Sequence, residues 1–105
     1  MTLKTSEVLT NAKQLIDSPE KWIQGDFSND NNTCFCALGA ISEVLKIDPM
    51  TVYRTAAAAR LKNSVSDSPL IGHWETFASY NYRADHAQVM DAFDSAIALS
   101  AKLGD

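Results

Sequence analysis

One apolar spacing recurs along this chain and constrains its fold more than any other feature. Apolar residues fall at positions i, i+1, i+4, i+7 and i+8, which places them on one face of a helix with about 3.6 residues per turn. No segment shows the sustained alternation that is typical of a half-buried strand. The four sets are Val8, Leu9, Ala12, Leu15 and Ile16; Ala37, Leu38, Ile41, Val44 and Leu45; Leu70, Ile71, Trp74, Phe77 and Ala78; and Val89, Met90, Phe93, Ala96 and Ile97.

Residues that favour helix starts divide this pattern into elements. Ser18-Pro19, Asp48-Pro49 and Ser68-Pro69 each pair a capping residue with a proline suited to the first helical position. Asp85 and Gln88 have the spacing of a capping box. We therefore expect an all-α fold, a compact bundle of about five short amphipathic helices near 5–17, 34–46, 49–62, 69–79 and 86–103, with room for a further turn of helix at 19–23.

Size and composition limit the class of protein. The 105 residues fit a single helical domain, 1–105, and an apolar content of 46% can fill its core. A net charge of −4 argues against broad contact with nucleic-acid phosphates. No apolar run reaches the ~20 residues that span a bilayer, and Met1 to Thr10 lack the blocks of a signal peptide. We expect a cytoplasmic protein with reduced cysteines and no membrane contact.

Two thiols, Cys34 and Cys36, stand at the predicted start of the second helix. The positive end of a helix dipole favours thiolate there, so Cys36 is a candidate nucleophile with His73 or His86 as its base. The same four residues supply donors for a zinc site, although Cys-x-Cys is closer than the usual ligand spacing. Small thiols also serve as packing residues. We expect neither a metal nor a cofactor, and a cysteine-dependent enzyme at Cys36 stays an alternative.

Residues 40–62 resemble a helix-turn-helix, which gives a second alternative, a DNA-binding regulator. Ile47 would fill the turn, and residues 51–54 would open the recognition helix. Lys46 stands where a turn glycine is usual, and the chain as a whole is acidic. The candidate DNA contacts are Lys46, Thr51, Tyr53, Arg54, Arg60 and Lys62.

Three short motifs are spread over most of the chain: Trp22-Ile23-Gln24-Gly25, then Cys36-Ala37-Leu38-Gly39-Ala40, then Tyr80-Asn81. Their order resembles a family of short bacterial and phage-associated proteins of unknown function. That family usually has Asp where this chain has Tyr82. The resemblance implies a shared fold and no catalytic residues.

Aromatic residues and an arginine gather around the last of these motifs, and such residues dominate interface energies. We predict a small accessory or regulatory protein that acts by binding another protein, with nucleic acid as a less favoured partner. An origin in a phage or mobile element follows only from the resemblance. The predicted contact residues are Trp22, Gln24, Phe27, Tyr80, Asn81, Tyr82 and Arg83.

Overall fold

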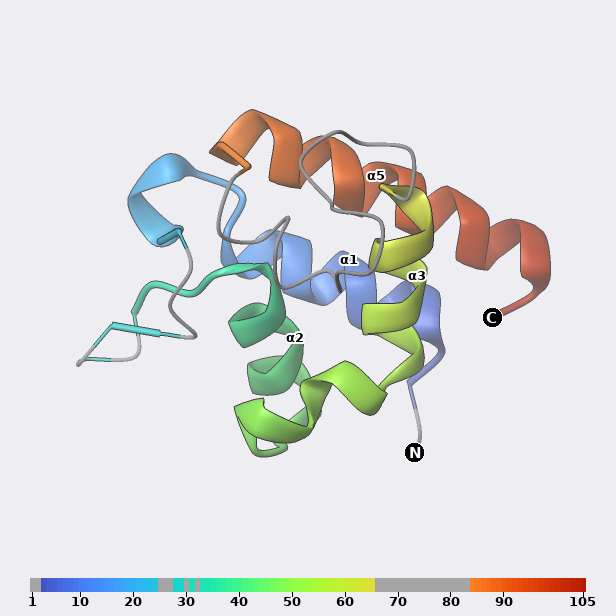
Figure 1. Ribbon diagram of the computed structural model, residues 1–105, viewed down its shortest axis with the longest axis horizontal. Helices are drawn as coiled ribbons and strands as arrows, with labels where there is room; N and C mark the ends of the chain where they lie inside the picture. Colours follow the sequence, from blue (N-terminus) through green and yellow to red (C-terminus); the bar gives the residue numbers. More distant parts are fainter. Residues whose placement is uncertain (1–2, 25–27, 30, 32, 66–83) are drawn as a thin grey trace.

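The computed structural model describes residues 3–24, 28–29, 31, 33–65 and 84–105. Within these residues helix α1 packs against α2, α3 and α5, and α3 also packs against α5. Figure 1 shows α1 between α5 and α2, with α3 beside them and both chain ends on the same side. The predicted all-α bundle is confirmed. The α-helices are α1 (Thr5–Leu15), α2 (Ala37–Leu45), α3 (Ala56–Ser64) and α5 (His86–Leu103), and the 3₁₀ helices are η1 (Pro19–Lys21) and η2 (Pro49–Arg54).

The apolar stripes of α1, α2 and α5 form the core, as their spacing predicts. In each of these stripes the central residues are buried, and Leu15, Val44, Leu45, Met90 and Ile97 are partly buried against them. Phe93 is the largest fully buried side chain in the described part of the chain. Alanines in these stripes, such as Ala12 and Ala96, are small enough to let neighbouring helices approach closely. The stripe at 70–78 and the predicted helix at 69–79 lie outside the described residues.

Helix α5 begins and ends where the sequence predicts. The Asp85 carboxylate accepts a hydrogen bond from Gln88 N at 2.8 Å, and the Gln88 side chain accepts one from Asp85 N at 2.9 Å. At the other end Gly104 adopts φ 81°, a left-handed conformation that glycine reaches without strain. Local signals therefore define both ends of this helix.

The helix predicted at 49–62 is wrong as a single element, because the chain breaks at Thr55. Thr55 is extended, with ψ 153°, and its hydroxyl accepts a hydrogen bond from Ala58 N at 3.1 Å to cap α3. Val52 and Leu61 are both fully buried. At about 100° per residue, a continuous helix would hold these two side chains on opposite faces, so the break lets both enter the core.

The elements predicted at 5–17, 19–23 and 34–46 are each shorter in the structure. Helix α1 ends at Leu15, and the predicted turn at 19–23 is the 3₁₀ helix η1, whose Ser18 side chain forms no cap. Helix α2 starts at Ala37 instead of residue 34, because Phe35 is held in an extended conformation by distant backbone groups. Phe35 N donates to Lys21 O at 3.0 Å, and Ile23 N donates to Phe35 O at 3.1 Å.

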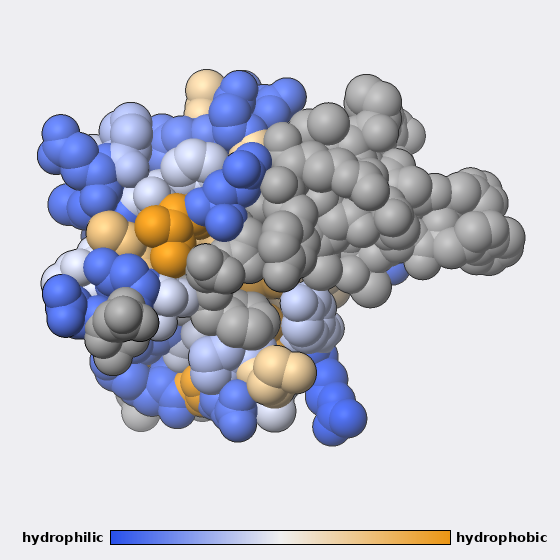
Figure 2. Space-filling model, turned by 60° about the vertical axis from the view of Figure 1, so that its left-hand side comes forward, coloured by the Kyte–Doolittle hydropathy of each residue, from blue (hydrophilic) through white to orange (hydrophobic). Residues whose placement is uncertain are grey.

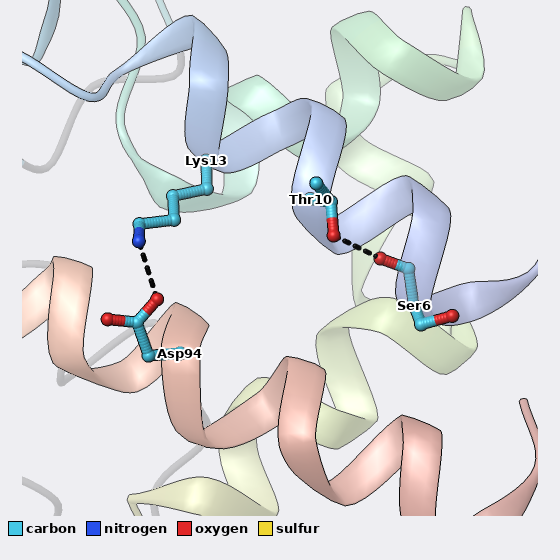
Figure 3. Close-up of polar contacts among 4 residues, drawn as sticks. All are labelled: Ser6, Thr10, Lys13 and Asp94. Carbon is cyan, nitrogen blue, oxygen red and sulfur yellow. Dashed lines mark hydrogen bonds and ion pairs between the residues drawn. The ribbon is translucent and has the colours of Figure 1, made fainter.

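Polar contacts fix the antiparallel arrangement of α1 and α5. The Lys13 ammonium group lies 2.5 Å from the Asp94 carboxylate (Figure 3). Near the first turn of α1, Ser6 N donates to Asp105 O at 2.8 Å, and the Thr10 hydroxyl donates to Ser6 O at the same distance. Exposed ion pairs such as Lys13–Asp94 add little stability, so they set the register of helices that apolar contacts hold together.

We expect Phe93→Ala to lower the free energy of unfolding by about 3–5 kcal/mol, because it removes a fully buried ring and leaves a cavity. Chemical denaturation followed by circular dichroism measures this change. Leu103→Ala is the matched control on the same helix, since that side chain is 56% exposed, and we expect it to change stability by less than about 0.5 kcal/mol. Equal losses for both variants would contradict this account of the core.

Candidate functional site

Cys36 lies at the N-cap of α2, and its side chain is fully buried. The sulfur accepts a hydrogen bond from Gly39 N at 3.4 Å, which satisfies one of the free amide groups of the first helical turn. The prediction that Cys36 stands at a helix start is therefore confirmed. A buried thiol that caps a helix offers no surface to a substrate.

Cys34 is only half-buried and is not part of the core, contrary to the expectation that it acts as an apolar filler. Its thiol donates a hydrogen bond to Glu20 O at 3.2 Å and so links the approach of α2 to η1. The Asn29 side chain holds the same approach, since its oxygen accepts from Thr33 N at 2.8 Å and Cys34 N at 3.1 Å. Nothing in the sequence pattern singled out Asn29, whose role depends on contacts made across a loop.

His86, the candidate base, is engaged by α1 and by the segment before α2. Its Nε2 lies 2.7 Å from Ile16 O, and because a carbonyl only accepts, Nε2 carries the proton and donates. The imidazole also packs against the Trp22 indole, with ring centroids 5.6 Å apart. The other candidate base, His73, lies outside the described residues. Among the residues that are described, no group of three or more His, Cys, Asp or Glu side chains is placed to hold a metal ion.

The structure brings two of the predicted partner contacts, Trp22 and Gln24, to the start of α5. The Gln24 amide donates to Ala84 O at 2.8 Å, and Trp22 packs against the core and His86. Both side chains therefore help to attach the segment after η1 to α5. The other predicted contacts, Phe27 and Tyr80 to Arg83, lie outside the described residues, so this contact surface stays a prediction.

The predicted recognition helix is not continuous, since Thr51, Tyr53 and Arg54 lie in η2 while Arg60 and Lys62 lie in α3. Lys46 does end α2 in a left-handed conformation, with φ 56°, where a glycine would be usual. Its ammonium group pairs with Glu43 at 2.8 Å. The residues predicted to contact DNA thus come from a turn and two separate short helices.

Arg60 forms an ion pair with Asp105, which ties α3 to the end of α5. The guanidinium group donates to both carboxylate oxygens. These hydrogen bonds hold the pKa of Asp105 below its ordinary value and raise the pKa of Arg60. One of the predicted DNA contacts therefore has a structural role in this fold.

Two hollows flank the ion pair of Glu43 and Lys46. One has a volume of about 240 Å³, smaller than typical ligand pockets, and is lined by Ser28, Phe35, Gly39, Ser42, Glu43, Lys46, Ile47 and Pro49. The other, of about 420 Å³, is an open groove lined by Leu3, Asn11, Gln14, Leu15, Glu43, Val44 and Lys46. Neither lining includes Cys34, Cys36 or His86, so these hollows do not assemble the predicted enzyme site.

Two of the four exposed large apolar side chains of the described residues lie on η2. Figure 2 shows one face of the molecule, on which hydrophilic residues cover most of the coloured surface and apolar patches are small. Met50 is 72% exposed and Tyr53 is 43% exposed, whereas Val52 between them is fully buried. Residues three apart are aligned in a 3₁₀ helix, so Met50 and Tyr53 project on the same side. Nothing in the sequence marks Met50 as exposed, because apolar character alone favours burial.

Residues 1–99 match the model of DUF6197, which is described as a family of unknown function. The chain belongs to this family. The predicted resemblance to a family of unknown function is thereby confirmed. No curated protein and no solved structure matches the chain. Membership of DUF6197 assigns no activity.

The two thiols provide a test of the arrangement at the start of α2. We expect Cys34 to react with Ellman's reagent in the folded protein, and Cys36 to react only after denaturant is added, because Cys36 is fully buried. Cys34→Ser should therefore abolish the reaction of the folded protein, while Cys36→Ser should leave it. A reactive Cys36 in the folded Cys34→Ser variant would contradict its assignment as a buried cap.

The ion pair of Arg60 and Asp105 predicts a pH dependence of stability. The folded-state pKa of Asp105 is lowered, so its contribution is present above the ordinary pKa of 3.8 and is lost as pH falls through the lowered value. Arg60→Gln should lower the melting temperature near neutral pH, and its difference from the wild type should shrink in acid. Arg54→Gln is the control, since Arg54 makes no ion pair within the described residues. A difference independent of pH would contradict this role.

Proposed function

We propose that this protein acts by binding another protein, and that η2 presents the contact surface. The observation that carries the proposal is the exposure of Met50 and Tyr53 on one side of η2, beside Arg54. Methionine, tyrosine and arginine are all enriched in protein interfaces. Burying a large apolar side chain is worth about 1.5–3 kcal/mol, and a partner that covers this surface would gain that stabilisation.

The backbone of η2 is held firmly, which favours binding because little order has to be imposed on association. The Asp48 carboxylate accepts from Met50 N at 2.9 Å and caps the element. The Thr51 hydroxyl donates to Asp48 O at 2.8 Å, and the Thr55 hydroxyl donates to Val52 O at 2.7 Å. Val52 anchors the inner side in the core. Met50 and Tyr53 therefore project from a 3₁₀ helix whose backbone is held by these hydrogen bonds.

Three reactive or charged side chains of the described residues support binding over catalysis, because each already has a structural contact. Cys36 caps α2, His86 donates to Ile16 O, and Arg60 pairs with Asp105. The proposal includes a reducing cytoplasmic setting, in which both cysteines stay free, and a bacterial or phage source. Helices in the described part of the chain lack the length and apolar character needed to cross a bilayer.

We expect immobilised wild-type protein to retain a specific protein from a lysate of the source cells, and Met50→Ala with Tyr53→Ala to weaken that interaction by about tenfold or more. Affinity capture with quantitative mass spectrometry, followed by titration of the captured protein, measures this. The matched control is Leu3→Ala with Leu103→Ala, which removes the other exposed large apolar side chains of the described part. Circular dichroism confirms that each variant is folded.

Three results would contradict the proposal. Equal capture by both double variants would exclude η2 as the contact. Loss of capture by Tyr80→Ala with Tyr82→Ala, while the η2 variant still binds, would assign the contact to the surface that the sequence predicts. If no protein is retained by the wild type above the level of either double variant, protein binding itself is wrong.

A further inference from the structure

The cations of this chain are distributed unevenly. The segment from Pro49 to Val65, which forms η2 and α3, contains Arg54, Arg60 and Lys62 and no acidic residue. All thirteen Asp and Glu residues lie outside it. In an otherwise acidic protein, the elements that expose Met50 and Tyr53 therefore carry three cations and no acid of their own, and Asp48 stands at the N-cap of η2.

The positive charges of this segment differ in their availability. Arg60 is paired with Asp105 and contributes little net charge. Arg54 and Lys62 are exposed, and neither forms an ion pair with any described residue. Arg54 is the residue after Tyr53 on η2, and it is exposed about a third of a turn away from the side that presents Met50 and Tyr53. The surface thus combines apolar contact area with positive charge that no described residue pairs with.

We propose that η2 binds an acidic segment of a partner protein, with apolar side chains of that segment on Met50 and Tyr53 and its carboxylates beside Arg54. This inference rests on the proposed function and adds the chemistry of the partner. Charge complementarity carries it, because oppositely charged surfaces attract in encounter and exclude wrong partners. Arginine also matches a carboxylate with two parallel hydrogen bonds, which favours an acidic peptide over a neutral one.

The same observations favour a protein over a nucleic acid. Affinity for a phosphate backbone grows with the number of phosphates neutralised, and this segment offers only two cations, Arg54 and Lys62, that form no ion pair with a described residue. The prominent side chain of η2 is Met50, which is apolar and has no donor for a base edge or a phosphate. An acidic peptide with apolar residues can contact both the cations of this segment and the exposed apolar side chains of η2.

Selection from a phage-displayed library of random peptides shows which peptide sequences this surface prefers to bind. The full-length wild type is the bait, and Arg54→Glu is the charge-reversed variant. Lys102→Glu is its matched control, because Lys102 is an exposed cation in the last turn of α5. We expect the wild type and Lys102→Glu to enrich peptides rich in Asp or Glu together with Leu, Phe or Trp, and Arg54→Glu to lose the acidic preference.

Binding of one enriched peptide, measured by fluorescence anisotropy, gives the size of the effect. Arg54→Glu should weaken it by about tenfold at low salt, and the difference should shrink as salt screens the charges. Met50→Ala with Tyr53→Ala should weaken it at every salt concentration. Enriched peptides without acidic residues, or binding equal in Arg54→Glu and Lys102→Glu, would overturn the inference.

Two other occupants are tested in parallel. A short DNA duplex that binds the wild type more tightly than the enriched peptide, and loses binding in Arg54→Glu, would make the surface a nucleic-acid site and overturn the inference. A wild-type dimer in sedimentation that Met50→Ala with Tyr53→Ala abolishes would make the occupant a second copy. If partner capture depends on Met50 and Tyr53 but the peptides show no acidic preference, protein binding stands and only this chemistry is wrong.

Discussion

The packing of α1 against α5 is the interaction on which the rest of the described structure depends. The buried stripe of α1 is shared among α2, α3 and α5, so these helices meet through it. Polar contacts follow the same interface in antiparallel order: Ser6 N bonds Asp105 O, Lys13 pairs with Asp94, and Ile16 O accepts from His86. Apolar burial supplies the stability, and these contacts select one register of the two helices.

This arrangement gives two of the candidate catalytic residues, His86 and Cys36, a structural role. His86 is the first residue of α5, and its imidazole bonds to the end of α1, where the two helices must meet. Cys36 is placed by the entry into α2, whose extended backbone is paired with residues 21 and 23. His86 links α5 to the end of α1, and Cys36 caps α2. Their presence in the sequence is therefore no evidence of catalysis.

The sequence predicted the structure best where the deciding interactions are local. Helix α5 was predicted with its correct ends, because its apolar stripe and the capping box of Asp85 and Gln88 are local, and the structure adds Gly104 as the local residue that ends it. The extended state of Phe35 was missed, since its partners lie more than ten residues earlier in the chain. The pairing of Arg60 with Asp105 joins residues 45 positions apart, and no local pattern reports it.

The same reasoning applies to the candidate site. Trp22 and Gln24 were chosen as surface residues from their types and their motif; Trp22 packs against His86, while Gln24 is exposed and its amide bonds to Ala84 O just before α5. Tyr53 and Arg54 were chosen as DNA contacts, and the structure does expose them, although on a 3₁₀ helix. The sequence therefore pointed to Tyr53 and Arg54 as contact residues, although for DNA. Whether a given side chain is exposed or packed depends on tertiary contacts, which the sequence does not show.

The break at Thr55 also decides which apolar side chain of η2 enters the core. At about 100° per residue, a continuous helix from 49 to 62 would place Met50 within about 20° of Leu61, on the buried face. Instead Val52 is buried and Met50 is 72% exposed. The fold therefore buries the smaller side chain and leaves the larger one in solvent, beside Tyr53 and Arg54. A surface that a partner covers would recover the apolar area that this arrangement exposes, which is why η2 is the strongest candidate for the contact.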